Sequence, residues 1–292
     1  MTSPDTSRLP LWLKTPPAKP GNLGKVRRTL ARLGLATVCE GARCPNRSQC
    51  YAAGTATFMI LGESCTRSCG FCSVPSGKPE RPEPSEPARV AEAVRVWGLK
   101  YAVVTSVTRD DLPDGGAGQF ARTVEALRGL KPAPLVELLI PDLRGDRDAL
   151  ETVLSSRPDV LGHNLETVPR LYPRVRPGAD YAKSLELLKR SAAAGLLTKT
   201  GLMLGLGEED EELEEVFHDA ARAGVAVLTL GQYLRPTRSR LPVARYRRPE
   251  EFEELGEKAR RCGIPTIAAG PLVRSSYLAE AYYRQSKLWR QR

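Results

Sequence analysis

The stretch ATFMILGESCTRSCGFCSV, residues 56–74, joins a short apolar run to three closely spaced cysteines. The run at residues 56–61 is typical of a buried strand. Cys65, Cys69 and Cys72 follow with CxxxCxxC spacing, in what we expect to be a loop directly after that strand. Thiolates this close can bind one cubane iron–sulfur cluster, because each ligates a different iron. Three thiolates leave one iron open for chemistry, and no nearby histidine completes a zinc site instead.

Downstream of this stretch, short apolar runs alternate with segments of helical periodicity. The predicted strands are residues 56–61, 101–107, 135–140, 160–164, 198–204 and 226–232. The predicted helices are residues 86–98, 116–130, 145–156, 180–195, 209–224 and 249–263. Six strand–helix units in series predict an α/β fold with a parallel sheet, either an open doubly wound sheet or a partial barrel. Both architectures place the active site at the C-terminal ends of the strands.

A second set of three cysteines lies upstream, in CEGARCPNRSQC: Cys39, Cys44 and Cys50. We call these the upstream trio, and the cysteines of the CxxxCxxC stretch the loop trio. The chain therefore divides into an N-terminal extension with the upstream trio (1–54), a strand–helix body (55–269) and a C-terminal tail with the sequence RSSY (270–292).

Composition narrows the class of protein. The longest apolar run is too short for a membrane span, and the N-terminal residues lack the apolar core of a secretory signal. We therefore expect a cytoplasmic protein whose thiols are reduced or metal-bound. The net charge of +10 is compatible with nucleic acid, an acidic protein, an anionic small molecule or merely a basic surface. With two histidines in 292 residues, a His-rich zinc catalyst is disfavoured.

The CxxxCxxC stretch after the first strand resembles the signature of the radical S-adenosylmethionine enzymes. The resemblance implies a partial (β/α)6 barrel of TIM type, with the extension and tail added. It also implies that the open iron is chelated by S-adenosylmethionine, which is cleaved to methionine and a 5′-deoxyadenosyl radical. Phe71, just before the third cysteine of the loop trio, matches an aromatic residue that packs near the adenine.

Both trios together resemble the lipoyl synthases, as do the stretches VVTSVTRDDLPDGGAGQF, HNLETVPRLYPRVRPGADY, TKTGLMLGLGE and GPLVRSSYLAEAYY. This resemblance covers roughly residues 20–280. It implies two [4Fe–4S] clusters: a radical-forming cluster on the loop trio and an auxiliary, sulfur-donating cluster on the upstream trio. A serine of RSSY holds the fourth iron of the auxiliary cluster; we favour Ser276, with Ser275 as the fallback. The implied reaction inserts sulfur at C6 and C8 of a protein-bound octanoyl-lysine.

The same resemblance suggests cofactor contacts at the strand ends. Thr105, with Ser106, could face the methionine amine; Asn164 and Glu166 could contact the ribose or carboxylate; Arg176 could pair with the carboxylate. Met203 lies in a stretch that supports both ends of the cofactor. We also expect Arg109 and Asp110 to lie near the substrate or the auxiliary-cluster region. Asp110, Asp111 and Asp114 should favour the next helix N-terminus, and His163 and Cys262 should be core residues.

Implied partners are an octanoylated lipoyl-carrier domain, such as the E2 component of a 2-oxoacid dehydrogenase or the glycine-cleavage H protein, an electron donor and an iron–sulfur carrier protein. Neither nucleic acid nor a membrane is expected. The positive charge could steer an acidic carrier, with Lys25, Arg27, Arg28 and Arg32 as docking candidates. The alternatives are a biotin synthase, a methylthiotransferase acting on tRNA, and a non-enzymatic iron–sulfur or zinc protein that binds nucleic acid.

Overall fold

The computed structural model describes residues 9–15, 17–18 and 21–290, with side chains up to residue 287. The chain forms two compact units, which we treat separately. The first-half unit comprises Pro17–Ser68 and Ser73–Gly162. The second-half unit comprises the described residues up to 15, the short segment Cys69–Cys72, and the chain from His163 onward. The three-part division made from the sequence stays a prediction, and its outermost residues, 1–8 and 291–292, lie outside the described part.

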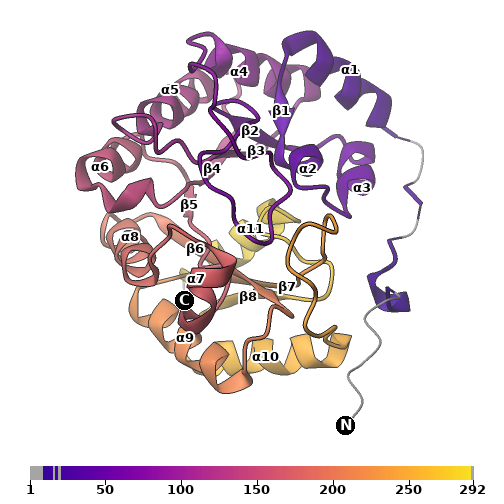
Figure 1. Ribbon diagram of the computed structural model, residues 1–292. Helices are drawn as coiled ribbons and strands as arrows, with labels where there is room; N and C mark the ends of the chain where they lie inside the picture. Colours follow the sequence, from indigo (N-terminus) through magenta and orange to yellow (C-terminus); the bar gives the residue numbers. More distant parts are fainter. Residues whose placement is uncertain (1–8, 16, 19–20, 291–292) are drawn as a thin grey trace. The chain divides into compact units, whose positions relative to one another are not determined.

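The described residues of the first-half unit form five strands joined by helices (Figure 1). Four of them are parallel neighbours in chain order, and the two-residue β1 pairs antiparallel with β2. The strands are β1 (Ala36–Thr37), β2 (Thr57–Ile60), β3 (Tyr101–Ser106), β4 (Leu135–Leu139) and β5 (Val160–Gly162). The helices are α1 (Leu23–Leu33), α2 (Val38–Gly41), α3 (Arg47–Ala52), α4 (Glu86–Trp97), α5 (Ala117–Arg128), η2 (Leu143–Gly145) and α6 (Arg147–Ser155).

Within its described part, the second-half unit repeats the strand–helix order with three parallel strands. These are β6 (Leu197–Leu204), β7 (Val227–Gln232) and β8 (Thr266–Ala269). Its helices are η1 (Leu11–Leu13), η3 (Pro169–Leu171), α7 (Tyr172–Val175), α8 (Tyr181–Ala193), α9 (Asp210–Arg222), α10 (Pro249–Arg261) and α11 (Ala279–Arg290). All six strands and six helices predicted from the sequence are present, while β1 and β8 were not predicted.

Side-chain alternation along β6 and β7 separates a core face from an inner face. Leu202 and Leu204 of β6 pack with Leu228 and Leu230 of β7 in a core that includes residues of α9 and α10. The residues between them therefore point to the opposite face. There Gly201 has no room for a side chain, since an added Cβ would lie 2.5 Å from the Oγ1 atom of Thr229. This inner face of the second-half unit is where the strand-end polar residues gather.

The helices of the described residues include none that is both long enough and apolar enough to cross a membrane.

Candidate functional site

The upstream trio is held by two short helices of the first-half unit. Cys39 lies in α2, which begins where the Thr37 hydroxyl accepts a hydrogen bond from the Glu40 N–H, 3.3 Å away. The Cys44 N–H donates to the Cys39 carbonyl at 3.1 Å, which closes the turn between the first two cysteines. Cys50 lies in α3. Thus the CxxxxCxxxxxC spacing becomes helix, turn and helix.

The Cys39 side chain of this trio is buried, and those of Cys44 and Cys50 are partly buried. Burial, together with the neighbouring sulfur of Cys44, raises the pKa of Cys39 from 9.0 to about 11. Burial and the sulfurs of Cys39 and Cys44 raise the pKa of Cys50 to about 12. Two thiolates in this place would repel each other unless a cation lay between them. The trio therefore suits iron, which binds thiolate and offsets its charge.

A buried tyrosine supports the trio. The Tyr51 ring, next to Cys50, is fully buried, and its hydroxyl lies 2.8 Å from the Thr37 hydroxyl, which caps the helix of Cys39. Burial raises the pKa of Tyr51, so the phenol stays neutral. One side-chain pair thereby links α2 to α3.

The loop trio begins in the first-half unit with Cys65, just after β2. Its sulfur accepts hydrogen bonds from the backbone N–H groups of Arg67 at 3.4 Å and Thr108 at 3.3 Å. Its own N–H donates to the Pro75 carbonyl, and its carbonyl accepts from Gly77. Two donors aimed at one sulfur fix the direction in which that sulfur points.

Arg67 braces this loop against the ends of two neighbouring strands. Its guanidinium forms paired hydrogen bonds with Asp110, at 2.7 and 2.9 Å, and with Asp142, at 2.6 and 2.9 Å. Burial disfavours the charged form of Arg67, but hydrogen bonds to both carboxylates outweigh it and raise its pKa. The sequence prediction missed these paired bonds of Arg67 to two carboxylates, which we call the Arg67 fork. Asp110 was expected to favour the N-terminus of α5, but its carboxylate pairs with Arg67 instead. Of the three acidic residues in that stretch, Asp114 accepts hydrogen bonds from N–H groups at the start of α5.

A second arginine fixes the point where β2 ends. The Arg109 side chain is only 2% exposed, and it donates to the Leu61 carbonyl at 3.0 Å and to both oxygens of Asp111. Leu61 has a positive φ of 69°, and its N–H donates to the Glu86 carboxylate at 3.0 and 3.1 Å. Arg109, expected near the substrate or the auxiliary-cluster region, thus also holds the backbone that leads into the loop trio.

The other two cysteines of the loop trio belong to the second-half unit. Between them, Gly70 donates its N–H to the Val175 carbonyl, and its carbonyl accepts from the Leu241 N–H, both at 2.9 Å. An added Cβ at Gly70 would lie 2.6 Å from a Leu241 methyl and 3.0 Å from the Arg174 carbonyl. Phe71 packs against the core of this unit. The CGFC segment is thus held by close backbone contact, which explains its glycine.

Polar residues at the inner face of the second-half unit form one cluster. The Asn164 amide donates to Glu166 at 3.1 Å, and its oxygen accepts from the Ser275 hydroxyl at 2.9 Å. Burial raises the pKa of Glu166, although Arg176, Asn164 and Arg274 act in the opposite direction. The Arg176 guanidinium donates to the carbonyls of Asn164 and Leu165 at 2.9 and 3.3 Å. The structure therefore brings together three of the predicted cofactor contacts and adds Ser275.

The GLGE turn after β6 is closed by its own glutamate. The Glu208 carboxylate accepts the N–H groups of Gly205, Leu206 and Gly207 at 2.7 to 3.1 Å. Gly205 has a φ of 97° and lies against the Gln232 amide and the Arg245 carbonyl, so only glycine fits there. Met203, near the end of β6, is partly buried against the core.

The remaining predicted positions have mixed outcomes. The Thr105 hydroxyl donates to the Leu139 carbonyl of β4 at 2.8 Å, while the hydroxyl oxygen of Ser106 is buried without a hydrogen-bond partner. His163 is a core residue, as expected, with its Nε2 3.0 Å from the Ser184 hydroxyl. Cys262 is not fully buried as a core thiol would be: it follows the end of α10 and is partly buried, packed against the edge of the core.

A cavity of about 620 Å³ lies in the first-half unit between α1, α4 and the loop after β2. Its lining includes Arg27 of α1, Glu40 next to Cys39, and Ser64 next to Cys65. Helix α1, which carries several basic residues, thus lines the same cavity as a neighbour of the upstream trio and a neighbour of the loop trio.

Comparison with known proteins decides the family. The profile of the Radical SAM superfamily matches residues 59–220. A lipoyl synthase of Desulfotalea psychrophila is 52% identical over 283 residues, which is 96% of this chain and 95% of the relative. A lipoyl synthase of Pyrobaculum arsenaticum is 54% identical over 285 residues, 96% of each chain. This chain belongs to the lipoyl synthase family.

Solved structures show the same fold at much lower sequence identity. Streptococcus suis SuiB bound to its precursor peptide SuiA superposes with a TM-score of 0.56 at 11% identity, over 85% of this chain and 52% of SuiB. Methylornithine synthase (PylB) gives 0.53 at 11% identity, over 86% of this chain and 82% of that one. The partial barrel expected from the resemblance is confirmed as the fold class, and family membership rules out the alternatives considered from the sequence.

A lipoyl synthase of this superfamily uses S-adenosylmethionine and an iron–sulfur cluster, and the residues present fit both groups. Cys65 directs its sulfur with two backbone donors, and the buried Ser106 hydroxyl leaves one polar atom unpaired at the end of β3. An unpaired buried hydroxyl is costly unless a ligand satisfies it. Both observations point to bound groups at the strand ends of the first-half unit.

Proposed function

We propose that this enzyme, a sulfurtransferase, replaces one hydrogen at C6 and one at C8 of an octanoyl-lysine with sulfur, which gives the lipoyl group. The observation that supports this most directly is the pairing of both cysteine trios with near-full-length similarity to lipoyl synthases. The substrate class, a protein-bound octanoyl chain, follows from the family.

We assign a different duty to each trio. Cys65, Cys69 and Cys72 would hold the cluster that binds S-adenosylmethionine, and Cys39, Cys44 and Cys50 would hold a second [4Fe–4S] cluster. When bound, these groups supply hydrogen-atom abstraction from unactivated carbon and the sulfur that replaces the hydrogen. The upstream trio's short helices hold three sulfurs near one another, which is the arrangement a cubane needs.

The fourth ligand of the second cluster would be a serine of the RSSY sequence. From the sequence we favoured Ser276. Ser275 is the fallback, and its hydroxyl donates to the Asn164 oxygen within the second-half unit. An oxygen ligand is harder than a thiolate and binds iron less tightly, which suits a cluster that gives up sulfur.

The predicted S-adenosylmethionine contacts fall into a polar group, an apolar group and Thr105. Asn164, Glu166 and Arg176 form the hydrogen-bonded inner-face cluster and can position polar groups. Phe71 and Met203 offer partly buried apolar surface for the adenine and methionine ends. Thr105 uses its hydroxyl within the sheet, so its contact with the cofactor would be through the β3 backbone or the neighbouring Ser106.

We propose an acidic lipoyl-carrier domain as the macromolecular partner, either of an E2 component or of the H protein. The chain's net charge of +10 favours such a partner. Lys25, Arg27, Arg28 and Arg32 are exposed on α1, and Arg27 lines the 620 Å³ cavity. An electron donor and an iron–sulfur carrier protein complete the proposal. We place the reaction in the cytoplasm, where a reducing medium keeps six cysteines available to iron.

The test uses anaerobically reconstituted protein, S-adenosylmethionine, a reductant and an octanoylated carrier domain. Wild type should contain about eight irons per chain and add two sulfur atoms to the carrier, read by mass spectrometry. Cys39→Ala should retain about four irons, still form 5′-deoxyadenosine and add no sulfur. Cys65→Ala should form neither product. Lipoylation by Cys39→Ala with its other cluster intact would refute the assignment.

The two serines are separated by the same assay. If Ser275 is the ligand, Ser275→Ala should lose sulfur insertion while retaining 5′-deoxyadenosine formation, and Ser276→Ala should resemble wild type. The reverse pattern would support Ser276, the choice favoured from the sequence. Full activity in the double variant would exclude an RSSY ligand.

A further inference from the structure

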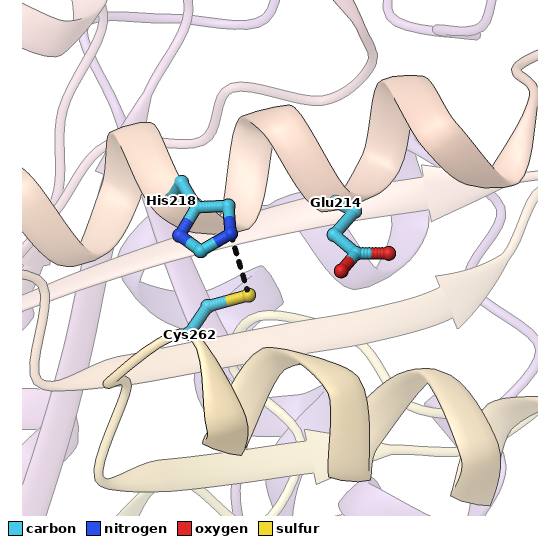
Figure 2. A group of neighbouring side chains, drawn as sticks. All are labelled: Glu214, His218 and Cys262. Carbon is cyan, nitrogen blue, oxygen red and sulfur yellow. Dashed lines mark hydrogen bonds between the residues drawn. The ribbon is translucent and has the colours of Figure 1, made fainter.

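Three side chains outside both cysteine trios meet at the surface of the second-half unit. Glu214 and His218 lie on α9, and Cys262 follows α10 (Figure 2). Their ligand atoms, a carboxylate oxygen, an imidazole nitrogen and a thiol sulfur, all lie within 4.8 Å of one another. Figure 2 shows the three side chains directed into the space between the two helices.

The helices present these groups in a way that suits a metal. Glu214 and His218 are four residues apart and therefore share one face of α9. The same i, i+4 spacing serves helical zinc ligands elsewhere. The Cys262 sulfur is 3.6 Å from the His218 Nε2 atom. In a tetrahedral zinc site, Zn–S and Zn–N bonds of about 2.3 and 2.0–2.1 Å place sulfur and nitrogen roughly 3.5 Å apart. Sulfur and nitrogen are already at that spacing.

The position of the thiol is fixed by the backbone. Cys262 ends α10 in a helical conformation, and the next residue, Gly263, turns the chain with a φ of 105°. An added Cβ at Gly263 would lie 3.8 Å from the Ala221 methyl of α9, so the helix end lies directly against α9. The carboxylate is the adjustable ligand, because the Glu214 side chain is 47% exposed.

The donor set selects the metal. Magnesium and calcium prefer oxygen ligands alone. Thiolate, imidazole and carboxylate together are typical of zinc, which accepts three protein ligands and a water. A thiolate and a carboxylate would also balance the charge of a divalent ion. The present neighbour of Glu214 is the Lys258 ammonium, 3.6 Å away and partly exposed, which can turn to solvent when the ion binds.

We propose that Glu214, His218 and Cys262 bind one Zn²⁺ ion, with water as the fourth ligand, and that this ion ties the end of α10 to α9. The site shares no residue with either trio and does not depend on the proposed reaction. It gives a role to Cys262, the only cysteine of the chain outside the two trios, and to one of its two histidines.

The test uses the full chain with its iron–sulfur clusters reconstituted and then freed of zinc. Zinc is added in competition with a chromophoric chelator, and bound zinc is measured together with iron. We expect one zinc per chain with no loss of iron. Zinc K-edge absorption, which iron does not obscure, should show one sulfur at about 2.3 Å and the remaining ligands nitrogen or oxygen near 2.0–2.1 Å. The melting temperature should rise with zinc.

Cys262→Ser and His218→Gln should weaken zinc binding by more than the roughly 10- to 100-fold that loss of an outer-shell partner costs. Glu215→Gln, an exposed neighbour on α9, is the matched control and should bind zinc like wild type. The proposal is overturned if His218→Gln and Glu215→Gln bind alike, if no sulfur appears at the zinc edge, or if zinc enters only as iron leaves. Lipoylation activity without added zinc should be the same in all three variants, so a failed zinc site and a failed reaction are distinguishable.

Discussion

The upstream trio and the loop trio differ in what surrounds their sulfur atoms. The upstream cysteines lie on or next to short helices within one unit, and burial and mutual repulsion raise the pKa of Cys39 and Cys50. The first sulfur of the loop trio receives two backbone N–H groups, in a loop held by the Arg67 fork.

This difference separates two ways to prepare a metal site. In the upstream trio, only a bound cation would offset the negative charge of the thiolates. Deprotonating these cysteines without a metal therefore costs free energy. In the loop trio, backbone N–H groups of the protein set the direction of the first sulfur before any metal binds. Such a contrast is compatible with one cluster that is consumed and rebuilt and another that persists through turnover.

The largest effect is expected from removing the Arg67 fork. Arg67→Met leaves Asp142, whose side chain is 3% exposed, without its cationic partner, and such a loss typically costs about 3–5 kcal/mol. We expect reconstituted protein to lose most of the loop-trio iron and all 5′-deoxyadenosine formation, while the upstream trio keeps about four irons. Iron analysis and a cleavage assay measure this.

Arg95→Met is the matched control, because Arg95 pairs with Glu92 on the exposed face of α4. Exposed pairs contribute little to stability, so both clusters should survive. If Arg67→Met retains radical formation at the wild-type rate, the fork does not prepare the loop trio and the contrast between the trios fails.

The sequence revealed the elements that bury continuous apolar runs. β3 and β7 were predicted because all or nearly all their residues are buried, which leaves a clear apolar signal. β8 was missed because Thr266–Ala269 is four residues long and half alanine, and β1 because it has only two residues. Pairing to a neighbour, rather than local composition, makes these segments strands.

For the candidate site, the sequence supplied the cysteines but not their supports. Arg67 and Asp142 are 75 residues apart, so no local spacing connects them. One signal was available: Asp110 and Asp142 each follow a predicted strand, so both lie at the same edge of a parallel sheet, where a loop arginine could reach them. Likewise, Ser275 and Asn164 are 111 residues apart, so their hydrogen bond cannot be predicted from local sequence.

Close packing at Gly70 offers a smaller test within the loop trio. Gly70→Ala would force Leu241 and the backbone apart, which typically costs about 1–3 kcal/mol. We expect lower iron occupancy of the loop trio and a lower melting temperature. Gly77→Ala in the same loop is the control, since an added Cβ there meets nothing within 4 Å. Equal losses in the two variants would show that the CGFC segment needs no close backbone contact.

The pH dependence of the metal-free chain tests the upstream trio. The folded pKa values of Cys39 and Cys50, about 11 and about 12, lie above the ordinary 9.0, so the folded state holds these protons more tightly. Their contribution to stability is complete below about pH 9 and is lost as pH rises through the folded pKa values. The melting temperature of metal-free protein should therefore fall above about pH 9, and less so in Cys39→Ala/Cys50→Ala. A wild-type curve as flat as that of the double variant would mean that the thiols are not buried together.

The smallest effect is expected at the support beneath the upstream trio. Tyr51→Phe removes the hydroxyl that meets Thr37, and loss of one such hydrogen bond costs about 1 kcal/mol. The Thr37 cap on α2 remains, so the cluster should still form, but a chelator should remove iron from the upstream trio faster, with the loop trio unaffected. Thr37→Ser keeps the oxygen and is the control. The contact between Tyr51 and Thr37 links only α2 and α3. Faster loss of iron from both trios would therefore mean that Tyr51 stabilises the whole unit, and that the two cysteine sites are not independent.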